Sequence, residues 1–146
     1  MTDEPLEAQI DRLLGRRSAV VGATARALRS AVLEAAPESV EEVDFGNKLI
    51  AYGSSMKMRD LTFAIIPHSA HVNLQLADSV DLPNPKGLIE GTGKRIRHVK
   101  VRSVEAARSA EIKTVIEAQL QHRRRPAAIN GRVISPASVS RSNLPP

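Results

Sequence analysis

The amino-acid sequence predicts an α+β fold, in which an antiparallel sheet of about four strands packs against N-terminal and C-terminal helices. Apolar residues recur at helical spacing near both ends of the chain, and they alternate with the period of a strand in the middle. The expected strands follow one another without helices between them. A parallel doubly wound sheet needs such helices, so the element order favours antiparallel pairing.

Two helices are expected at the N-terminal end. The first runs from about Pro5 to Leu14, because its apolar residues have helical spacing and Gly15 suits its end. The second follows Ser18, whose hydroxyl can cap a helix. Its apolar stripe continues at helical spacing until Pro37 ends the helix.

Three strands are expected in the middle of the chain. Lys48 to Tyr52 forms the first, with glycines on either side. Leu61 to Ile66 forms the second, and both of its faces are apolar, as in a strand that is covered on both sides. Val72 to Leu76 alternates apolar and polar residues, which predicts a half-buried third strand. Pro67 to Ala70 is the expected hairpin connection.

A long loop, a fourth strand and a last helix complete the predicted fold. Asp78 to Gly93 contains two prolines and three glycines, and we expect a loop with one helical turn near Gly87 to Glu90. Valines alternate with basic residues from His98 to Arg102, which predicts the fourth strand. Ser103 can cap the last helix, with Glu105 favourably placed in its first turn.

The length of the chain predicts one domain. A chain of 146 residues can bury a real hydrophobic core without disulfides, and we expect residues 1–122 to form it. Residues 123–146 are basic and rich in proline and serine. Such a segment buries too little apolar surface to order itself, so a disordered tail is expected.

The composition excludes several classes of protein. The chain has no cysteine, which rules out disulfide scaffolds, thiolate zinc sites, iron–sulfur ligation and cysteine nucleophiles. The first residues are acidic and polar, without the charged and then apolar pattern of a secretory signal. The apolar stretches are much shorter than the roughly 20 residues that span a membrane. A cytoplasmic protein without a membrane partner is therefore expected.

The positive charge lies mostly in the C-terminal part of the chain. Residues 1–44 carry five arginines and nine acidic residues, whereas residues 91–146 carry twelve basic and three acidic residues. A basic segment of this kind favours an anionic partner. The chain has only three aromatic residues, Phe45, Tyr52 and Phe63. Nucleic acid is not expected, because single strands usually stack on exposed aromatic rings.

A glycine-rich turn, Gly91-Thr92-Gly93-Lys94, precedes the basic strand. A phosphate-binding loop of nucleotide hydrolases needs a glycine where Leu88 stands and a serine or threonine where Arg95 stands. The hydrolase motif therefore fails at two positions. Backbone N–H groups in a glycine turn can still form a nest for an anion.

We therefore expect a ligand site in and after this turn. The hypothesis is that five residues face a shared cleft that takes a small anionic ligand or the acidic surface of a protein: Gly91, Gly93, Lys94, Arg97 and His98. The alternative is a flexible turn that enters a strand with a solvated basic face. A non-enzymatic binding domain is the leading interpretation.

Other residues offer weaker candidates for chemistry. An acidic run follows the second helix, and its carboxylates can bind cations through oxygen or simply solvate the helix end. The acidic run consists of Glu38, Glu41, Glu42 and Asp44. A second set of metal candidates lacks a known ligand spacing: His68, His71, Asp78 and Asp81. The motifs of serine hydrolases, zincins and dinucleotide-binding enzymes are missing from the sequence. An uncharacterised enzyme with His98 as its base is a further alternative.

Several local patterns carry a resemblance to a known family. Leu33–Pro37, followed by Val43–Gly46, is similar to a helix that ends in proline and leads through acidic residues to an aromatic residue and glycine. Val72–Leu74 stands at the position of the family's central strand. Gly87–Lys94 and then Arg97–Lys100 resemble the family's glycine-rich turn and basic strand most closely.

These patterns resemble the YdhG-like family, a bacterial domain of unknown function, over roughly two thirds of the chain, from about Thr24 to Gln121. The resemblance implies a compact α+β domain with an antiparallel sheet flanked by helices. Some members are described as candidate intracellular iron chaperones, partly because their architecture is similar to that of frataxin. For this chain, that function would place iron on the acidic run. Relatives often carry proline and aromatic residues where this chain has Asn47 to Tyr52.

Overall fold

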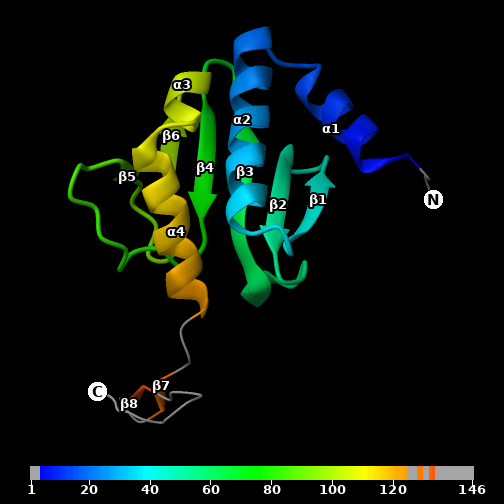
Figure 1. Cartoon of the computed structure of the whole chain (residues 1–146). Coiled ribbons are helices and arrows are strands. Elements are labelled where there is room, and N and C mark those ends of the chain that lie inside the picture. Colours follow the sequence, from blue (N-terminus) through cyan, green and yellow to red (C-terminus); the bar gives the residue numbers. More distant parts are fainter. Residues whose placement is uncertain (1–3, 125–127, 130–131, 134–146) are drawn as a thin grey trace.

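The computed structural model describes residues 4–124, 128–129 and 132–133 (Figure 1). Helices and strands occur in the order that the sequence predicts, with additional short strands. The elements are α1 (Leu6–Leu14), α2 (Ala19–Ala35), β1 (Val40–Asp44), β2 (Leu49–Gly53), η1 (Met58–Asp60), β3 (Leu61–Pro67), β4 (Val72–Leu76), β5 (Ile89–Glu90), β6 (Arg97–Val101), α3 (Val104–Ala107), α4 (Ala110–Arg124), β7 (Ala128–Ile129) and β8 (Arg132–Val133).

A single antiparallel sheet holds six of these strands, in the order β1-β2-β3-β4-β6-β5. The predicted α+β class is confirmed, with six strands in place of about four. Figure 1 shows α2 and α4 lying across the same face of the sheet. We call the opposite face, which no described helix covers, the open face.

The hydrophobic core lies between the helices and the sheet. Side chains of a strand alternate between its faces, so every second strand residue joins this core. The strand residues in the core are Val43, Ile50, Tyr52, Phe63, Ile65, Val72, Leu74, Leu76, Val99 and Val101. Ile10 and Leu28 are fully buried against them from α1 and α2. Ala51 and Ala64 are also buried but lie outside this cluster, on the open face.

The predicted helix caps are present. The Ser18 hydroxyl accepts a hydrogen bond from the Val21 amide at 3.1 Å, and Ser103 does the same for Ala106 at 3.0 Å. The single C-terminal helix that the sequence predicts is divided into α3 and α4. Ser109 causes the division, because its hydroxyl accepts from the Ile112 amide at 3.2 Å and so begins a second helix.

Two predicted elements are wrong in type. The acidic run was expected in a loop, but most of it forms β1, whose Glu41 carboxylate is held on the helix side by Arg29. The helical turn expected at Gly87 to Glu90 is absent from this described segment, and Ile89–Glu90 pairs with β6 as β5. Both are edge strands of the sheet, and each has a single strand partner, β2 for β1 and β6 for β5.

Two further predictions concern the burial of the two faces of β3 and the structure of the C-terminal segment. Leu61 to Ile66 was expected to be covered on both sides, but the helices that the structure describes lie on one side of β3. Of the predicted disordered tail, α4 continues to Arg124 and β7 pairs with β8, while the other residues lie outside the described ranges. Within the described part of the chain, no helix is long and apolar enough to cross a membrane.

Candidate functional site

The glycine-rich turn is built into the hairpin between β5 and β6. Gly91 has a φ of +123°, and a side chain there would lie 3.3 Å from Cδ of Arg97 and 3.5 Å from Nδ1 of His98. A side chain at Gly93 would come within 2.6 Å of the Ile96 carbonyl oxygen. Both positions therefore require glycine for the backbone alone.

The structure brings Gly91, Arg97 and His98 together but gives them different tasks. Arg97 donates from Nε to the Gly93 carbonyl at 2.7 Å, so its guanidinium braces the turn. Arg97 and His98 are consecutive on β6 and leave its two faces, with His98 on the open face. The side chain of Lys94 is exposed. His98 is thus the member of the predicted set that belongs to the open face.

The acidic run is not gathered into one place. Glu38 pairs with Arg124 at 3.1 Å, and the Asp44 carboxylate accepts two hydrogen bonds from Asn47 within its own turn. Glu41 and Glu42 leave opposite faces of β1. Among the described residues, no group of three or more histidine, aspartate and glutamate side chains is placed to hold a metal ion. The geometry therefore lends the iron alternative no support.

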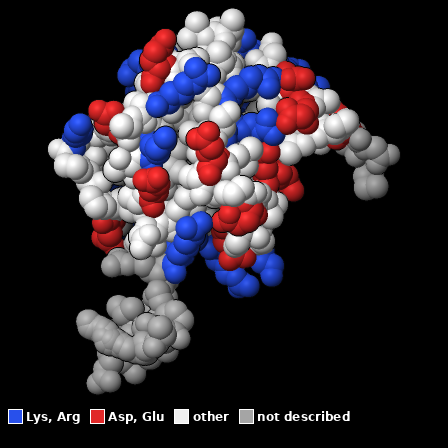
Figure 2. All heavy atoms as spheres, in the orientation of Figure 1, with Lys and Arg blue, Asp and Glu red and all other residues white. Residues whose placement is uncertain are grey.

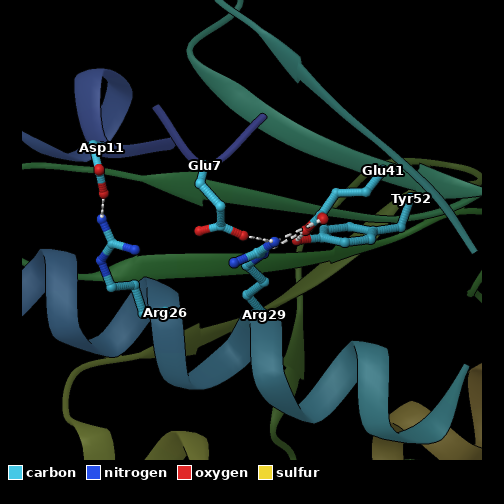
Figure 3. A network of polar contacts seen from close by, with 6 residues as sticks. All are labelled: Glu7, Asp11, Arg26, Arg29, Glu41 and Tyr52. Atoms are coloured by element: carbon cyan, nitrogen blue, oxygen red, sulfur yellow. Dashed lines mark hydrogen bonds and ion pairs between the residues drawn. The ribbon is translucent and has the colours of Figure 1, made fainter. Parts of the chain in front are cut away.

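Glu41 belongs instead to a buried polar network that the sequence did not predict (Figure 3). Its carboxylate accepts from Nε and Nη2 of Arg29, at 2.7 and 3.1 Å, and from the Tyr52 hydroxyl at 2.7 Å. Arg29 also donates to the exposed Glu7 at 2.7 Å. Burial and the carboxylate beside it raise the pKa of Tyr52, so the phenol stays protonated. The network ties α1 and α2 to β1 and β2, which is a structural task.

The open face shows a different chemistry. One row of side chains crosses all six strands through directly paired positions. In sheet order, the row reads Glu42, Ala51, Ala64, Gln75, His98 and Glu90. Ala51 and Ala64 make the part of the row on β2 and β3 small and apolar, and the carboxylates of Glu42 and Glu90 lie at the two edges of the sheet. His98 faces Glu90 with 3.8 Å between Nε2 and Oε1.

Basic side chains gather on the β4 and β6 part of this face. Gln75 pairs with His98 and Asn73 pairs with Lys100. The next position along both strands places His71 beside Arg102, since Val72 pairs with Val101 between them. We call these residues the open-face ladder: His71, Asn73, Gln75, His98, Lys100 and Arg102. Lys100 and Arg102 form no ion pair with any residue that the structure describes.

The pKa of His71 reflects its burial and the positive charges of the ladder. The ring of His71 stacks on His68, with 4.7 Å between ring centroids. Burial lowers the pKa of His71, and the positive charges of His68, Lys100, Arg102 and His98 lower it further. The fold therefore holds several like charges close together. On the helix-bearing face, by contrast, Figure 2 shows cationic and anionic side chains mixed across the surface.

Comparisons with protein-family models, with curated proteins and with solved structures found no match. The open face itself carries a basic stripe beside small apolar residues, with acidic groups at its margins.

The sequence contains a signal that would have found the open-face ladder. From His71 to Gln75, polar residues occupy every second position, and from His98 to Arg102 basic residues do the same. Each alternation by itself predicts one strand. Placing both on one surface requires knowing that β4 pairs with β6, which skips β5 and a long loop. The sequence shows the alternating residues of each strand, but it does not show that β4 pairs with β6.

Proposed function

We propose that this chain is a binding domain of the YdhG-like type, without a catalytic role, whose open face binds the acidic surface of a partner protein. The open-face ladder is the observation that carries the proposal. It extends the predicted anion site from His98 to neighbours that the sequence could not place beside it. The resemblance around the glycine-rich turn supports the family, and the charge of the ladder supports the partner's chemistry.

The basic residues of the ladder meet no acidic residue across the strand pair. His98 and Lys100 leave the same face of β6, and their direct partners on β4 are Gln75 and Asn73. Lys100 and Arg102 have no carboxylate partner among the described residues. Burial lowers the pKa of His71, and the cations around it lower it further. An acidic partner would supply the missing counter-charges.

The spread of the ladder favours a protein over a small ligand. Paired strands lie about 4.8 Å apart and alternate residues along a strand about 6.7 Å apart, so three rows extend over about 13 Å. That length exceeds a single phosphate or carboxylate group. Ala51, Ala64 and Ile66 lie beside the ladder on the same face and offer apolar contact. Small apolar residues next to a charged stripe suit a protein surface.

Charge reversal within the ladder tests this function. We expect the double variant Lys100→Glu/Arg102→Glu to bind a fluorescein-labelled glutamate-rich peptide at least about tenfold more weakly than wild type, because two charge-assisted contacts become repulsive. Fluorescence anisotropy at low and physiological salt would measure the affinity. Wild-type binding should weaken with added salt, since exposed charges are screened.

A matched double variant tests whether peptide binding depends on the position of the charges in the ladder or only on the net charge of the protein. Arg108→Glu/Lys113→Glu makes the same charge change at exposed positions on the helix side. It should bind the peptide as wild type does, with a difference of about twofold or less. Thermal melts of both variants would show that each is folded. Equal affinities of the two double variants would reject the open face as the binding surface.

His71 gives the protein a distinctive response to acid. Its folded-state pKa is lowered, so below the unfolded-state value of about 6.5 the unfolded chain binds more protons and the native state loses stability as pH falls. His71→Asn should lose less stability than wild type between pH 7.5 and 5.5. Urea denaturation at both pH values would measure this difference. Parallel losses in the two proteins would show that His71 does not sense the ladder's field.

A further inference from the structure

A second basic region lies where the end of α1 meets the turn between β1 and β2. It is a hollow of about 650 Å³. Its lining consists of Arg12, Leu13, Arg16, Arg17, Phe45 and Lys48. We call this hollow the α1 pocket. Pockets of several hundred Å³ commonly bind small molecules, and a few converging polar groups select the ligand.

The charge inside the α1 pocket is mostly unbalanced. Arg12 pairs with Glu4 at 2.6 Å and lies 4.0 Å from the centroid of the Phe45 ring. The described part of the chain offers no ion-pair partner to Arg16, Arg17 or Lys48. The Asp44 carboxylate of the neighbouring turn accepts hydrogen bonds from Asn47 at both of its oxygens. Three cations therefore line one hollow without forming an ion pair to a described residue.

The backbone at Lys48 adds an independent observation. Its φ is +58°, in the left-handed region that favours glycine or asparagine. Gly46 and Asn47 stand immediately before it, so the turn contains both preferred residues at other positions. Lysine at position 48 is therefore a poor choice for the backbone alone. Strained residues of this kind concentrate at ligand sites, where the side chain compensates for the strain.

A purely structural role explains only part of the α1 pocket. Basic residues near a helix C-terminus interact favourably with the helix dipole, which accounts for Arg16 and Arg17 just after α1. The same argument does not apply to Lys48, which belongs to a hairpin turn. Phe45 also keeps 37% of its surface exposed at the rim. Exposed phenyl, strained lysine and unpaired arginines together indicate a ligand.

We propose that the α1 pocket binds a small phosphorylated molecule that carries at least two negative charges. Arg16, Arg17 and Lys48 would contact the phosphate oxygens, and the exposed Phe45 ring would contact an apolar part of the ligand. Arginine forms paired hydrogen bonds to phosphate, and lysine contributes a mobile point charge. The volume accommodates a diphosphate with room for a further group. This site is separate from the open face and does not depend on the proposed partner.

Lys48→Gly distinguishes a ligand role from a structural one. Glycine relieves the left-handed backbone, so the variant should have a melting temperature equal to or above that of wild type. The same variant should bind inorganic pyrophosphate at least about fivefold more weakly, since one charge-assisted contact is lost. Isothermal titration calorimetry with pyrophosphate would measure the affinity. A purely structural lysine would leave pyrophosphate binding unchanged.

Three further proteins complete the experiment. Arg16→Ala/Arg17→Ala should weaken pyrophosphate binding by about tenfold or more, and it decides the matter if Lys48→Gly is poorly folded. Lys57→Gly removes one charge at an exposed position with a φ of −66° and should bind as wild type does. Lys100→Glu/Arg102→Glu should also retain pyrophosphate binding, which separates this site from the open-face ladder.

Two results would overturn the α1 pocket as a phosphate site. One is a wild-type protein that fails to bind pyrophosphate at concentrations of about 1 mM. The other is wild-type affinity in both Lys48→Gly and the double arginine variant. Loss of pyrophosphate binding in the ladder variant alone would assign the anion to the open face, and so would also reject the pocket.

Discussion

Replacing Arg29 with methionine is expected to lower the free energy of unfolding by about 3–5 kcal/mol, because it leaves a buried carboxylate without its cation. The side chain of Glu41 is only 8% exposed, and three of its contacts come from Arg29 and Tyr52. Without Arg29, the Tyr52 hydroxyl alone remains to solvate the charge. Urea denaturation followed by circular dichroism would measure the loss.

A neighbouring ion pair provides the control (Figure 3). Arg26 also extends from α2 to a carboxylate of α1, but both Arg26 and its partner Asp11 are exposed. Arg26→Met should therefore cost about 1 kcal/mol or less. The two substitutions remove the same side chain from the same helix. A similar loss in both variants would show that Glu41 gains enough water when Arg29 is removed.

A second substitution tests whether the loss arises from Glu41. Adding Glu41→Gln to Arg29→Met removes the unpaired charge, so the double variant should recover part of the lost stability. The coupling between the two positions then reports the cost of the buried carboxylate. Additive losses would place the effect of Arg29 in its packing against β1 instead.

Replacing Gly53 with alanine is expected to cost about 3 kcal/mol, because the new methyl group collides with backbone. A Cβ atom at this position would lie 2.3 Å from the Asp60 carbonyl oxygen and 2.8 Å from Cα of Leu61. The pairing of β2 with β3 shifts at this point, so Gly53 pairs with Leu61 while Tyr52 pairs with Phe63. These atoms of Asp60 and Leu61 belong to the backbone, which cannot move aside as the end of a flexible side chain can.

Gly22→Ala is the matched substitution, and its expected effect has the opposite sign. Gly22 lies inside α2, where its added methyl group would meet Cβ of Leu14 at 3.9 Å, an ordinary contact. Alanine in a helix interior should stabilise the protein by about 0.5–1 kcal/mol relative to glycine. Thermal unfolding would rank the two variants on either side of wild type. A melting temperature of Gly53→Ala near that of wild type would show that the β2–β3 bulge adapts.

Much of the fold was predictable because local patterns agree with the tertiary structure. Apolar spacing and the hydroxyls of Ser18 and Ser103 located α1, α2 and the start of α3. Alternation located β3, β4 and β6. The misses have long-range causes. Strand β1 contains glutamates, and the partners that keep Glu41 in a strand are Arg29 and Tyr52, which lie 12 and 11 residues away.

The candidate sites were predictable only in part, for the same reason. His98 and the alternating basic residues after it are visible in the sequence, but their position beside His71 depends on the pairing of β4 with β6. The α1 pocket joins a helix end to a turn about 30 residues later. Lys48 looks like an ordinary strand residue until its backbone angle is known. Sequence patterns describe one element at a time, whereas both sites arise between elements.

The two outer strands of the sheet bear on how readily chains of this protein pair with one another while they fold. An unpaired strand edge is a template for other chains and a route to aggregation. At one margin the edge is only two residues long, in β5, and at the other β1 carries the exposed Glu42. A second molecule that added a strand beside β1 would bring its own acidic copy close to the first. The residues that hide β1 from sequence patterns thus also discourage intermolecular sheet growth.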